Sequence, residues 1–547
     1  MSSTVNDLFL QAVSAHAERV ALRMLIPKER RKGQGIRLIL NEISYARLGE
    51  MAARLAGALD ELGVKKGDRV AVIAKPRASW ATAFFAILLR GAAVLPLDPG
   101  LQEGEVERIL NEAQVKAVIV SGTKVPALLA IKERLVSSFV LVSMDRPKEE
   151  DVLFLDALVI GRKPLAPVTV DPSDLAILMY TSGTMGNAKG AMLTHGNLAT
   201  NAQTCVKVVD LSPTDNFLTI VPWYHIYGLT VTLITPLISG GTTTYAPVDP
   251  NLTQVLLKAN PTILLGVPKL YHVLYSKVRA SIDKGGIKKL LDRLAPRLMG
   301  WFVKRKLFGR RFRFFTSGGA PLSPEVAAGF RRMGIGVMEG YGLTETSPVL
   351  TMCEAFAVQP GMTAIPGIEL RVAHPDESGI GEVLARGPSI MTGYYKNPQA
   401  TAEVIDDDGW FHTGDLGRMD GDRLLLSGRA KNVIVLETGK NVYPEEVEWE
   451  LATLNGIEEI MVYEGQRQGA PAVAAKIYPN WTVLKDLGIA GPDAALDYFW
   501  EAVRSRCENL ALYKRIKNKD MISLVDEPFE KSVKLDIKRH VYQEPDQ

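Results

Sequence analysis

The glycine-rich segment at residues 180–195, YTSGTMGNAKGAMLTH, restricts the fold of this chain most strongly. It follows the apolar run LAILM, which is typical of a buried strand. Glycines let successive backbone N–H groups point toward one centre, and the hydroxyls and the lysine add further donors, so the segment predicts a phosphate-binding loop. The Walker A spacing is not met, because Gly186 lies three residues before Lys189. Composition alone would also fit a flexible surface loop.

This loop resembles the nucleotide-phosphate loop of the adenylate-forming superfamily, which contains acyl-CoA synthetases, luciferases and peptide-synthetase adenylation domains. The family form is close to YTSGTTGxPKG, and the chain departs from it at Met185 and Ala188. Neither departure removes a backbone donor or the lysine. The resemblance implies that ATP phosphates are held by Thr181, Ser182, Gly183, Thr184 and Lys189, with Thr184 also a ligand of Mg²⁺.

Helix and strand patterns alternate before this loop, over residues 1 to about 170, which predicts a layered and largely parallel α/β sheet. One helix is expected to begin after Ser44, and a strand is expected at residues 69–74. A chain of 547 residues is also too long for one ordinary domain. The resemblance implies an α/β fold with a large N-terminal domain of layered α/β subdomains, a small mobile α+β C-terminal domain and a hinge at Lys431. The predicted domains are residues 1–429 and 430–547.

Aromatic rings and one histidine cluster in VPWYHIYG, residues 221–228. A lone histidine among apolar residues is commonly a core residue. The segment nevertheless resembles the family's LPLxHxxG element, whose histidine lines the carboxylate end of the acyl pocket. The resemblance implies that His225 positions the substrate carboxylate, which needs no base when it is ionised. Pocket depth is expected to depend on packing near Trp223, Tyr227 and Gly266.

Four further segments follow in the family order: FFTSGGAPL, MEGYGLTET, WFHTGDL and GRAKNVI. In the family, the first packs against adenine and ribose, the second offers an aromatic face, hydroxyls and a hard oxygen ligand for Mg²⁺, and the third accepts both ribose hydroxyls. The arginine of the fourth reaches ribose and phosphate. The resemblance implies nucleotide contacts by Gly318, Gly319, Ala320, Glu339, Gly340, Tyr341, Gly342, Thr344, Asp415 and Arg429, with Glu345 as catalytic residue and metal ligand.

The C-terminal region carries two more resemblances. GKNVYPEEVE resembles the family's GxNVxPxEVE segment, so Gly439 is expected along the CoA pantetheine tunnel after the small domain turns. PFEKSVK, aligned with PKTxSGKxxR, places the family's essential lysine at Lys534. A second gap-free register, against PFEKTxTxKIKR, places Asp536 there instead. We assign the catalytic lysine to Lys534. If Asp536 is the equivalent position instead, adenylation should be badly weakened, because a carboxylate would face the negative charge that develops on phosphorus.

Bulk composition excludes several classes of protein. Lys and Arg number 64 against 61 Asp and Glu, so no nucleic-acid partner is expected. Three scattered cysteines form no metal or redox spacing and fit a reducing cytoplasm, and no secretory signal pattern is visible. The apolar runs at residues 80–97 and 217–238 are interrupted by Arg90 or by Pro and Gly, which favours buried elements over membrane spans.

A long basic helical stretch is expected at residues 269–313. It is interpreted as a solvated helix face, and the alternative is contact with an anionic membrane surface, at the inner face, or with CoA phosphates. The length of this insert resembles long-chain fatty acyl-CoA synthetases.

Together the resemblances predict an AMP-forming acid–thiol ligase that uses ATP and Mg²⁺ to activate a medium- or long-chain fatty acid and transfers it to coenzyme A. Two other ligases stay open: an aryl-CoA ligase, and one that delivers the acyl group to a carrier protein. An acyl- or nucleotide-binding homologue without turnover also stays open. The quaternary state is left open as well, a homodimer included.

Overall fold

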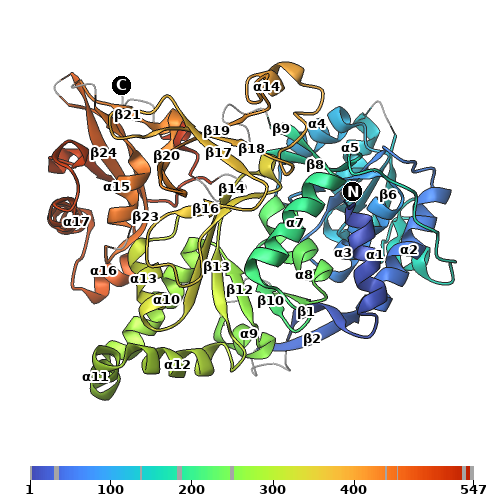
Figure 1. Ribbon diagram of the computed structural model, residues 1–547, viewed down its shortest axis with the longest axis horizontal. Helices are drawn as coiled ribbons and strands as arrows, with labels where there is room; N and C mark the ends of the chain where they lie inside the picture. Colours follow the sequence, from blue (N-terminus) through green and yellow to red (C-terminus); the bar gives the residue numbers. More distant parts are fainter. Residues whose placement is uncertain are drawn as a thin grey trace.

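The computed structural model describes residues 3–29, 36–135, 138–181, 188–246, 252–437, 440–452, 454–467, 469–531 and 537–542. Within these residues the fold is α/β, with a large N-terminal part and a smaller C-terminal part (Figure 1). The described helices include none that is long and apolar enough to cross a membrane.

The first sheet is built from strands between residues 69 and 194, on both sides of the glycine-rich loop. In the described chain it has seven strands in the order β7-β6-β5-β3-β4-β8-β9, parallel except for the antiparallel pair β8 and β9. These strands are β3 (Arg69–Ile73), β4 (Ala93–Leu97), β5 (Ala117–Val120), β6 (Val140–Ser143), β7 (Leu153–Phe154), β8 (Leu175–Thr181) and β9 (Lys189–Thr194). The predicted parallel sheet is therefore present, and the expected strand at 69–74 ends one residue earlier.

The second sheet joins a parallel centre to two antiparallel flanks. Its thirteen described strands run in the order β17-β18-β19-β20-β16-β15-β14-β13-β12-β10-β11-β1-β2. The central parallel strands are β10 (Asn216–Thr219), β11 (Thr242–Tyr245), β12 (Ile263–Gly266), β13 (Phe314–Ser317) and β14 (Gly336–Gly342). One flank is the N-terminal hairpin of β1 (Val20–Glu29) and β2 (Ile36–Ser44). The other is β15 (Val349–Met352), β16 (Met362–Ala364), β17 (Glu369–Ala373), β18 (Gly381–Arg386), β19 (Phe411–Asp420) and β20 (Arg423–Arg429).

Helices lie between the sheets and on their outer faces. Alternation along β3 shows the layering, because Val70 and Val72 pack into the core between the sheets whereas Ala71 and Ile73 pack outward. The inner helices are α1 (Val5–Ala15), α2 (Tyr45–Glu61), α3 (Ala78–Leu89), α7 (His195–Val209) and α8 (Thr235–Ile238). Those on the first sheet's outer side are α4 (Glu103–Ala113) and α5 (Val125–Arg134), while α6 (Leu155–Val159) packs on α2. Those on the second are α9 (Leu252–Ala259), α10 (Pro268–Asp283), α11 (Gly286–Leu294), α12 (Pro296–Leu307) and α13 (Pro324–Arg332), and α14 (Pro398–Ala402) follows β18.

Local sequence explains where two of these helices begin. The hydroxyl of Ser44 accepts from the backbone N–H of Arg47 at the start of α2, as expected from the sequence. Thr194 and Asn197 form a reciprocal capping box at the start of α7. The basic stretch after residue 269 is helical, as expected, and forms α10, α11 and α12.

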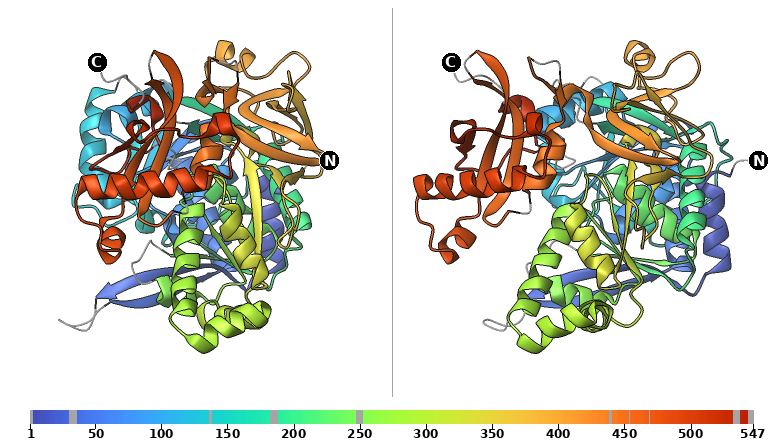
Figure 2. Two further views of the ribbon diagram at one scale, coloured as in Figure 1. Left: turned by 90° about the vertical axis from the view of Figure 1, so that its left-hand side faces the viewer. Right: turned by 60° about the vertical axis from the view of Figure 1, so that its left-hand side comes forward.

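The C-terminal part has a core of its own, built from residues between Ile434 and Ile522. Its elements are β21 (Ile434–Val435), β22 (Asn441–Val442), α15 (Pro444–Leu451), β23 (Ile457–Arg467), β24 (Ala470–Pro479), α16 (Trp481–Asp486), α17 (Pro492–Cys507) and β25 (Ile522–Leu524). All views place it at one side of the larger part, beside α13 and α10 in Figure 1 (Figures 1 and 2). The exact division at residues 429 and 430 stays a prediction.

Candidate active site

A cavity of about 430 Å³ opens at the carboxyl ends of the central parallel strands. Its lining includes Thr316 and Ser317 at the end of β13, Gly340 in β14, and Val267 directly after β12. Ligands of open α/β sheets bind at this edge, where the loops that follow the strands converge. Predicted site residues in the lining are Thr181, His225, Gly318, Gly319, Gly340, Tyr341, Gly342, Thr344 and Arg429.

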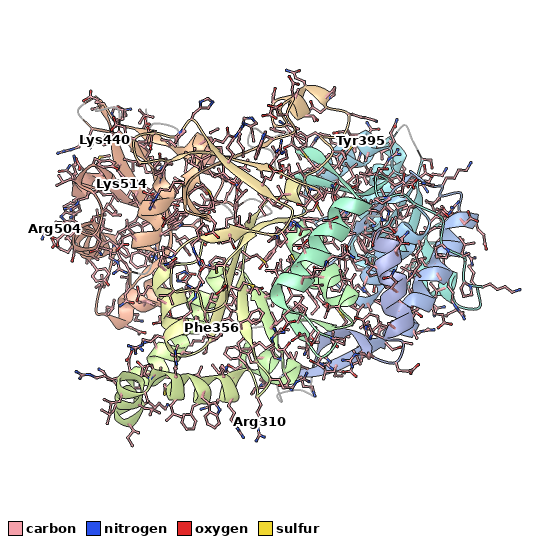
Figure 3. All side chains as sticks on the ribbon, viewed as in Figure 1. Arg310, Phe356, Tyr395, Lys440, Arg504 and Lys514 are labelled. Carbon is pink, nitrogen blue, oxygen red and sulfur yellow. The ribbon has the colours of Figure 1, made fainter. Side chains whose placement is uncertain are left out.

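Tyr394 connects two predicted site residues that lie far apart in the sequence. The ammonium of Lys189 lies 5.1 Å from the centre of the Tyr394 ring, and the Tyr394 hydroxyl donates to Glu345 at 2.9 Å. The segment is held beside β9, since the N–H of Tyr395 donates to the carbonyl of Gly190 (Figures 1 and 3). Sequence analysis missed this role for Tyr394. The one available signal was its place in the segment MTGYY, residues 391–395.

Glu345 is placed to hold a cation. Its side chain is buried, and one carboxylate oxygen has no hydrogen-bond partner among the described residues. A buried anionic oxygen without a partner is costly unless an ion or ligand group pairs with it. The described residues contain no cluster of three or more His, Cys, Asp or Glu that could hold a metal alone. Glu345 therefore fits Mg²⁺, which is commonly bound by one or two carboxylates together with substrate phosphates.

Asp415 and Arg429 face each other across β19 and β20, where they are register partners. The guanidinium Nε of Arg429 lies 3.0 Å from one oxygen of Asp415, and the hydroxyl of Tyr341 donates to the other at 2.8 Å. Burial raises the pKa of Tyr341 well above its ordinary value, and the Asp415 charge adds to this shift, so the phenol remains a donor. The three side chains thus form one polar group at the edge of the cavity.

The irregularity in β19 that carries Asp415 depends on glycine. Gly414 has φ +68°, a conformation that residues with a side chain rarely adopt, and the register with β18 shifts here, as in a β-bulge. The hydroxyl of Thr413 accepts from the N–H of Asp415 and donates to the carbonyl of Val383, which fixes the bulge on β18. The TGD pattern is therefore explained by backbone geometry as well as by the carboxylate.

The Gly318–Gly319 turn brings the backbone close to an aromatic ring. A Cβ atom on Gly318 would lie 2.9 Å from Cζ of Tyr227, and Gly319 has φ +84°. A residue with a Cβ atom would therefore narrow the cavity at Gly318 or strain the turn at Gly319. Tyr227 lines the cavity, as expected for a residue that affects pocket depth.

His225 lines the cavity as a half-buried side chain. Its ring packs against Tyr224 with centroids 4.8 Å apart. Burial, followed by the neighbouring Asp98 carboxylate, raises the pKa of Tyr224. Asp98 also lines the cavity, and sequence analysis did not single it out.

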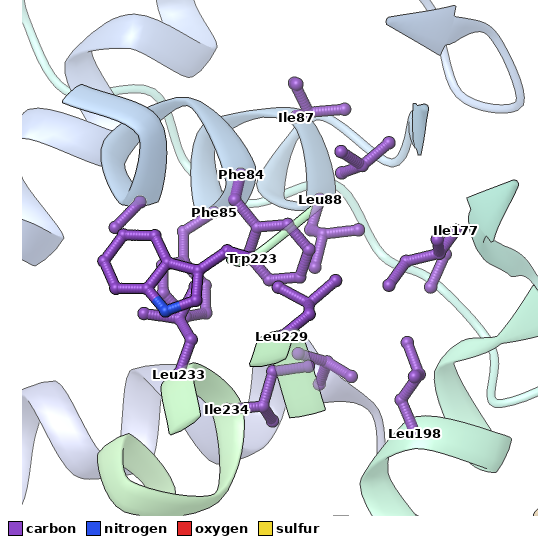
Figure 4. Packing of buried hydrophobic residues seen from close by; sticks show 14 of the residues in the cluster. Phe84, Phe85, Ile87, Leu88, Ile177, Leu198, Trp223, Leu229, Leu233 and Ile234 are labelled. Atoms are coloured by element: carbon purple, nitrogen blue, oxygen red, sulfur yellow. The ribbon is translucent and has the colours of Figure 1, made fainter. Parts of the chain in front are cut away.

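Trp223 and Gly266 are not among the residues that line the cavity. Trp223 is fully buried among the helices between the sheets and packs against Trp80, with centroids 5.6 Å apart (Figure 4). Its indole N–H donates to the hydroxyl of Thr232. The dependence of pocket depth on packing near Trp223 stays a prediction, because the neighbouring Pro222 and Tyr224 line the cavity although the Trp223 ring does not.

Five further predicted site residues are outside the cavity lining: Lys189, Ala320, Glu339, Glu345 and Asp415. The carboxylate of Glu339 pairs with Arg331 of α13 at 3.1 Å, because alternation along β14 points it away from its neighbours Met338 and Gly340. Ala320 is exposed beyond the glycine turn. Six predicted or alternative residues lie outside the described part of the chain: Ser182, Gly183, Thr184, Gly439, Lys534 and Asp536.

The described residues on either side of 532–536 pair with each other and with β23. Lys531 forms an isolated bridge with Ile537 and an ion pair with Glu459 of β23. Glu459 also lies 3.6 Å from the ammonium of Lys269, at the start of α10. Val267, two residues before Lys269, lines the cavity, so the described ends of this segment lie near the cavity side of the large part.

The family model described as "AMP-binding enzyme" matches residues 12–395, well over half of the chain. This chain belongs to the AMP-binding enzyme family. Among curated proteins, it is 30% identical to a feruloyl-CoA synthase of Amycolatopsis sp, over 77% of this chain and 80% of that protein. It is also 30% identical to the peroxisomal long chain acyl-CoA synthetase 7 of Arabidopsis thaliana, over 81% of this chain and 69% of that protein.

Solved structures of AMP-binding enzymes agree with this fold. ATP-bound MatB from Rhodopseudomonas palustris is 26% identical, with a TM-score of 0.77 over 99% of this chain and 98% of that chain. A benzoate CoA ligase from Burkholderia xenovorans LB400, at 21% identity and a TM-score of 0.77, shares the fold. The predicted superfamily and fold class are confirmed, and the protein is an adenylate-forming acid–thiol ligase that uses ATP, a carboxylic acid and CoA.

Proposed function

We propose that this AMP-binding enzyme activates a medium- or long-chain fatty acid as acyl-AMP and transfers the acyl group to free coenzyme A. The observation that carries this proposal is the continuity of the cavity. One lining contains polar residues such as Thr181 and Arg429 together with an apolar region beside the last turns of α7. A carboxylate and an alkyl chain require these two environments at opposite ends of one site.

The apolar end follows the last turns of α7. Cys205 and Val209 lie one helical turn apart there, roughly 6 Å along the axis. Phe217, Met338 and Met352 line the same region. These apolar lining residues support an alkyl substrate, and the 29% identity to a long-chain-fatty-acid–CoA ligase of Bacillus subtilis supports it further.

The polar end supports binding of the nucleotide. In this proposal Asp415 accepts the ribose hydroxyls, while Arg429 reaches ribose and phosphate from the facing strand. The adenine packs on the glycine turn that ends in Ala320 and on the backbone near Glu339. The remaining proposed nucleotide contacts are Thr181, Ser182, Gly183, Thr184 and Lys189 on the phosphates, with Gly318, Gly319, Gly340, Tyr341, Gly342 and Thr344 around the base and α-phosphate.

Glu345 and Thr184 are proposed to hold Mg²⁺. The orphaned buried oxygen of Glu345 supports this role. A bound Mg²⁺ would offset the charge of the phosphate groups during displacement. The hydroxyl of Tyr394 orients the carboxylate, since it donates to the other oxygen.

The chemical step needs positioning and charge compensation more than acid–base catalysis. His225 is proposed to hold the substrate carboxylate for in-line attack on the α-phosphate, which forms acyl-AMP and releases pyrophosphate. Lys534 is proposed to stabilise the charge that develops on that phosphate. Loss of adenylation in Lys534→Ala would support this assignment, and unchanged adenylation would remove it.

The second half-reaction is proposed to follow a rotation of residues 430–547 about Lys431. The rotation would withdraw Lys534 and bring the segment with Gly439 alongside the CoA pantetheine, whose thiol then attacks the mixed anhydride. The separate core of the C-terminal part supports movement as a unit.

Pyrophosphate exchange into ATP tests the substrate class directly. The panel contains octanoate, laurate, palmitate, ferulate, benzoate and malonate. We expect the highest kcat/KM for one of the three fatty acids, and no exchange with any acid would contradict adenylation itself. Thioester formation with free CoA, compared with a carrier protein, then identifies the acceptor.

An aryl-CoA ligase is the second candidate, because the feruloyl-CoA synthase relatives match as strongly as the long-chain enzymes. Ferulate or benzoate would then give the highest kcat/KM in the same panel. A homologue without turnover would bind ATP in equilibrium dialysis and show no exchange with any of the acids.

A further inference from the structure

Helix α11 presents its apolar side chains to solvent and its acidic side chain to the protein. Ile287, Leu290 and Leu294 lie on one helical face and are 85%, 57% and 73% exposed. Asp292, on the opposite face, is the only buried side chain of this helix. It is held by Arg279 of α10 and Arg332 of α13, each at 2.8 Å. Ion pairs therefore attach α11 to the molecule, and its apolar face has no partner among the described residues.

Helix α12 continues this face. Leu298, Trp301 and Phe302 are each nearly half exposed, and the rings of Trp301 and Phe302 lie edge to face with centroids 4.9 Å apart. Both helices project at one end of the molecule, at the bottom of Figure 1 (Figures 1 and 2). A contiguous apolar face of this kind marks an interaction site. The apolar face of α11 and α12 is defined here as these six residues: Ile287, Leu290, Leu294, Leu298, Trp301 and Phe302.

Basic residues surround the apolar face. Residues 284–311 contain ten Lys or Arg and a single acidic residue, Asp292. In the described part of the chain none of these ten cations forms an ion pair with a carboxylate. Arg305 instead stacks on the Trp301 ring at 5.1 Å, and Arg310 points away from the molecule at the same end (Figure 3). The surface thus combines exposed apolar groups with uncompensated positive charge.

We propose that the apolar face of α11 and α12 docks on an anionic lipid bilayer, with its leucines, isoleucine and aromatic rings in the interface and the flanking cations at the headgroups. Apolar side chains flanked by Lys and Arg are the pattern of helices that lie in a membrane interface. Charge complementarity favours anionic lipid over a second copy of this chain. An interface between two copies would bring the ten cations of one copy against the ten cations of the other. Docking is independent of which acid the active site takes.

Vesicle flotation of the full chain tests this proposal. We expect the protein to float with phosphatidylglycerol-containing vesicles, and to float less as salt rises because Lys and Arg near the surface are screened. Ile287→Asp/Leu294→Asp should lower vesicle affinity at least about tenfold, since each substitution removes an apolar anchor and adds a repelled charge.

A matched control uses the same residue types at similar exposure elsewhere. Ile160 and Leu512 are 77% and 72% exposed, so Ile160→Asp/Leu512→Asp should leave flotation within about twofold of the unmodified protein. Pyrophosphate exchange with a water-soluble acid and the unfolding midpoint verify that both variants fold. Charge reversal by Lys288→Glu/Lys289→Glu should weaken binding to anionic vesicles as well.

Three outcomes would overturn the proposal. The first is equal flotation of Ile287→Asp/Leu294→Asp and the unmodified protein. The second is equal binding to neutral phosphatidylcholine vesicles, which would remove the role of the cations. The third is self-association, measured by sedimentation, that the α11 variant abolishes while vesicles bind neither protein, which would assign the face to a second copy.

Discussion

At the scale of single residues, Tyr394 couples the predicted phosphate loop to the predicted metal ligand. Tyr394→Phe keeps the ring beneath Lys189 and removes the hydroxyl that donates to Glu345. Because Glu345 then has both carboxylate oxygens unpaired by protein donors, we expect kcat/KM for adenylation to fall roughly 10- to 100-fold, as for a loss of about 1–3 kcal/mol. Pyrophosphate exchange measured over a range of Mg²⁺ concentrations checks this, and the apparent Mg²⁺ affinity should change with it.

The neighbouring tyrosine provides a control for Tyr394→Phe. Tyr395 packs near Lys396 and contacts the β9 backbone through its own N–H, so Tyr395→Phe keeps that contact. It should retain the Mg²⁺ dependence of the unmodified enzyme. An identical Mg²⁺ dependence in Tyr394→Phe would show that the hydroxyl does not orient Glu345 for an ion.

His195, the first residue of α7, predicts a pH dependence of stability. Its ring is fully buried without a hydrogen-bond partner among the described residues, and burial lowers its pKa from 6.5 to about 4. The unfolded chain binds this proton at higher pH than the folded chain, so the free energy of unfolding decreases as pH falls from about 6.5 to about 4. The shift corresponds to about 3 kcal/mol in total.

His195→Phe should remove this contribution, because an apolar ring of similar size needs no proton and no partner. Urea unfolding at about pH 5 and about pH 7 measures the difference. His374→Phe, at an exposed position, should leave the pH dependence as it is in the unmodified protein. If His195→Phe loses stability with acid as steeply as the unmodified chain, other groups cause the decline.

Much of the site could be predicted from short motifs because each motif is local. The TGD bulge in β19 illustrates this, since Thr413, Gly414 and Asp415 form their geometry within three residues and one neighbouring strand. The role of Tyr394 could not be read in the same way, because it depends on pairing with β9 about 200 residues earlier. The nucleotide contact near Glu339 stays a prediction, but the sequence did not indicate the direction of its side chain, which is set by strand alternation and by Arg331.

At the scale of elements, helices with clear periodicity and caps were predictable, and long-range strand pairing was not. The helix after Ser44 begins where its serine cap and apolar spacing placed it. The hairpin of β1 and β2 belongs instead to the second sheet, where β1 pairs with β11 about 220 residues later. No local sequence pattern contains that information, because parallel strands that are far apart in the chain pair only through the tertiary packing of the whole sheet.

Helix α7 carries a prediction about acyl length. Val209 lines the apolar end of the cavity, whereas the adjacent Val208 points outward and is 42% exposed. Val209→Trp should fill the apolar end, so kcat/KM for palmitate should fall at least about tenfold relative to octanoate, because the lost apolar contacts cannot be replaced. The competing-acid exchange assay measures this ratio directly.

Val208→Trp adds the same ring on the solvent side of α7 and should leave the palmitate-to-octanoate ratio unchanged. Thr194→Ala, which removes the capping box at the other end of α7, separates stability from specificity. It should cost about 1 kcal/mol of unfolding free energy without changing that ratio. A palmitate preference that survives Val209→Trp would place the acyl chain elsewhere.

At the scale of the whole molecule, exposed ion pairs join the C-terminal part to the large part. Lys269 of α10 lies 3.2 Å from Glu458, and Arg506 of α17 lies 3.2 Å from Glu325 of α13. Lys269 and Glu325 are each 59% exposed at the side chain. Such pairs contribute about 0.2–1 kcal/mol each, so this orientation is only weakly preferred on their account.

Lys269→Ala/Arg506→Ala should therefore change the two half-reactions unequally. Removing both pairs, about 0.4–2 kcal/mol together, shifts the population of this orientation by about 2- to 30-fold, and the half-reaction it serves should slow by up to that factor while the other is unchanged or faster. Pyrophosphate exchange reports adenylation, and single-turnover thioester formation from preformed acyl-AMP reports transfer. Lys277→Ala, on an exposed position of the same helix α10, should alter neither rate.

Equal slowing of both rates by Lys269→Ala/Arg506→Ala would mean that these pairs stabilise the fold rather than one orientation, and an unchanged unfolding midpoint would remove that explanation too. The weak polar interface and the separate C-terminal core both lead us to expect a moving C-terminal unit. A unit that must turn once in every catalytic cycle can be held only by contacts that cost little free energy to break.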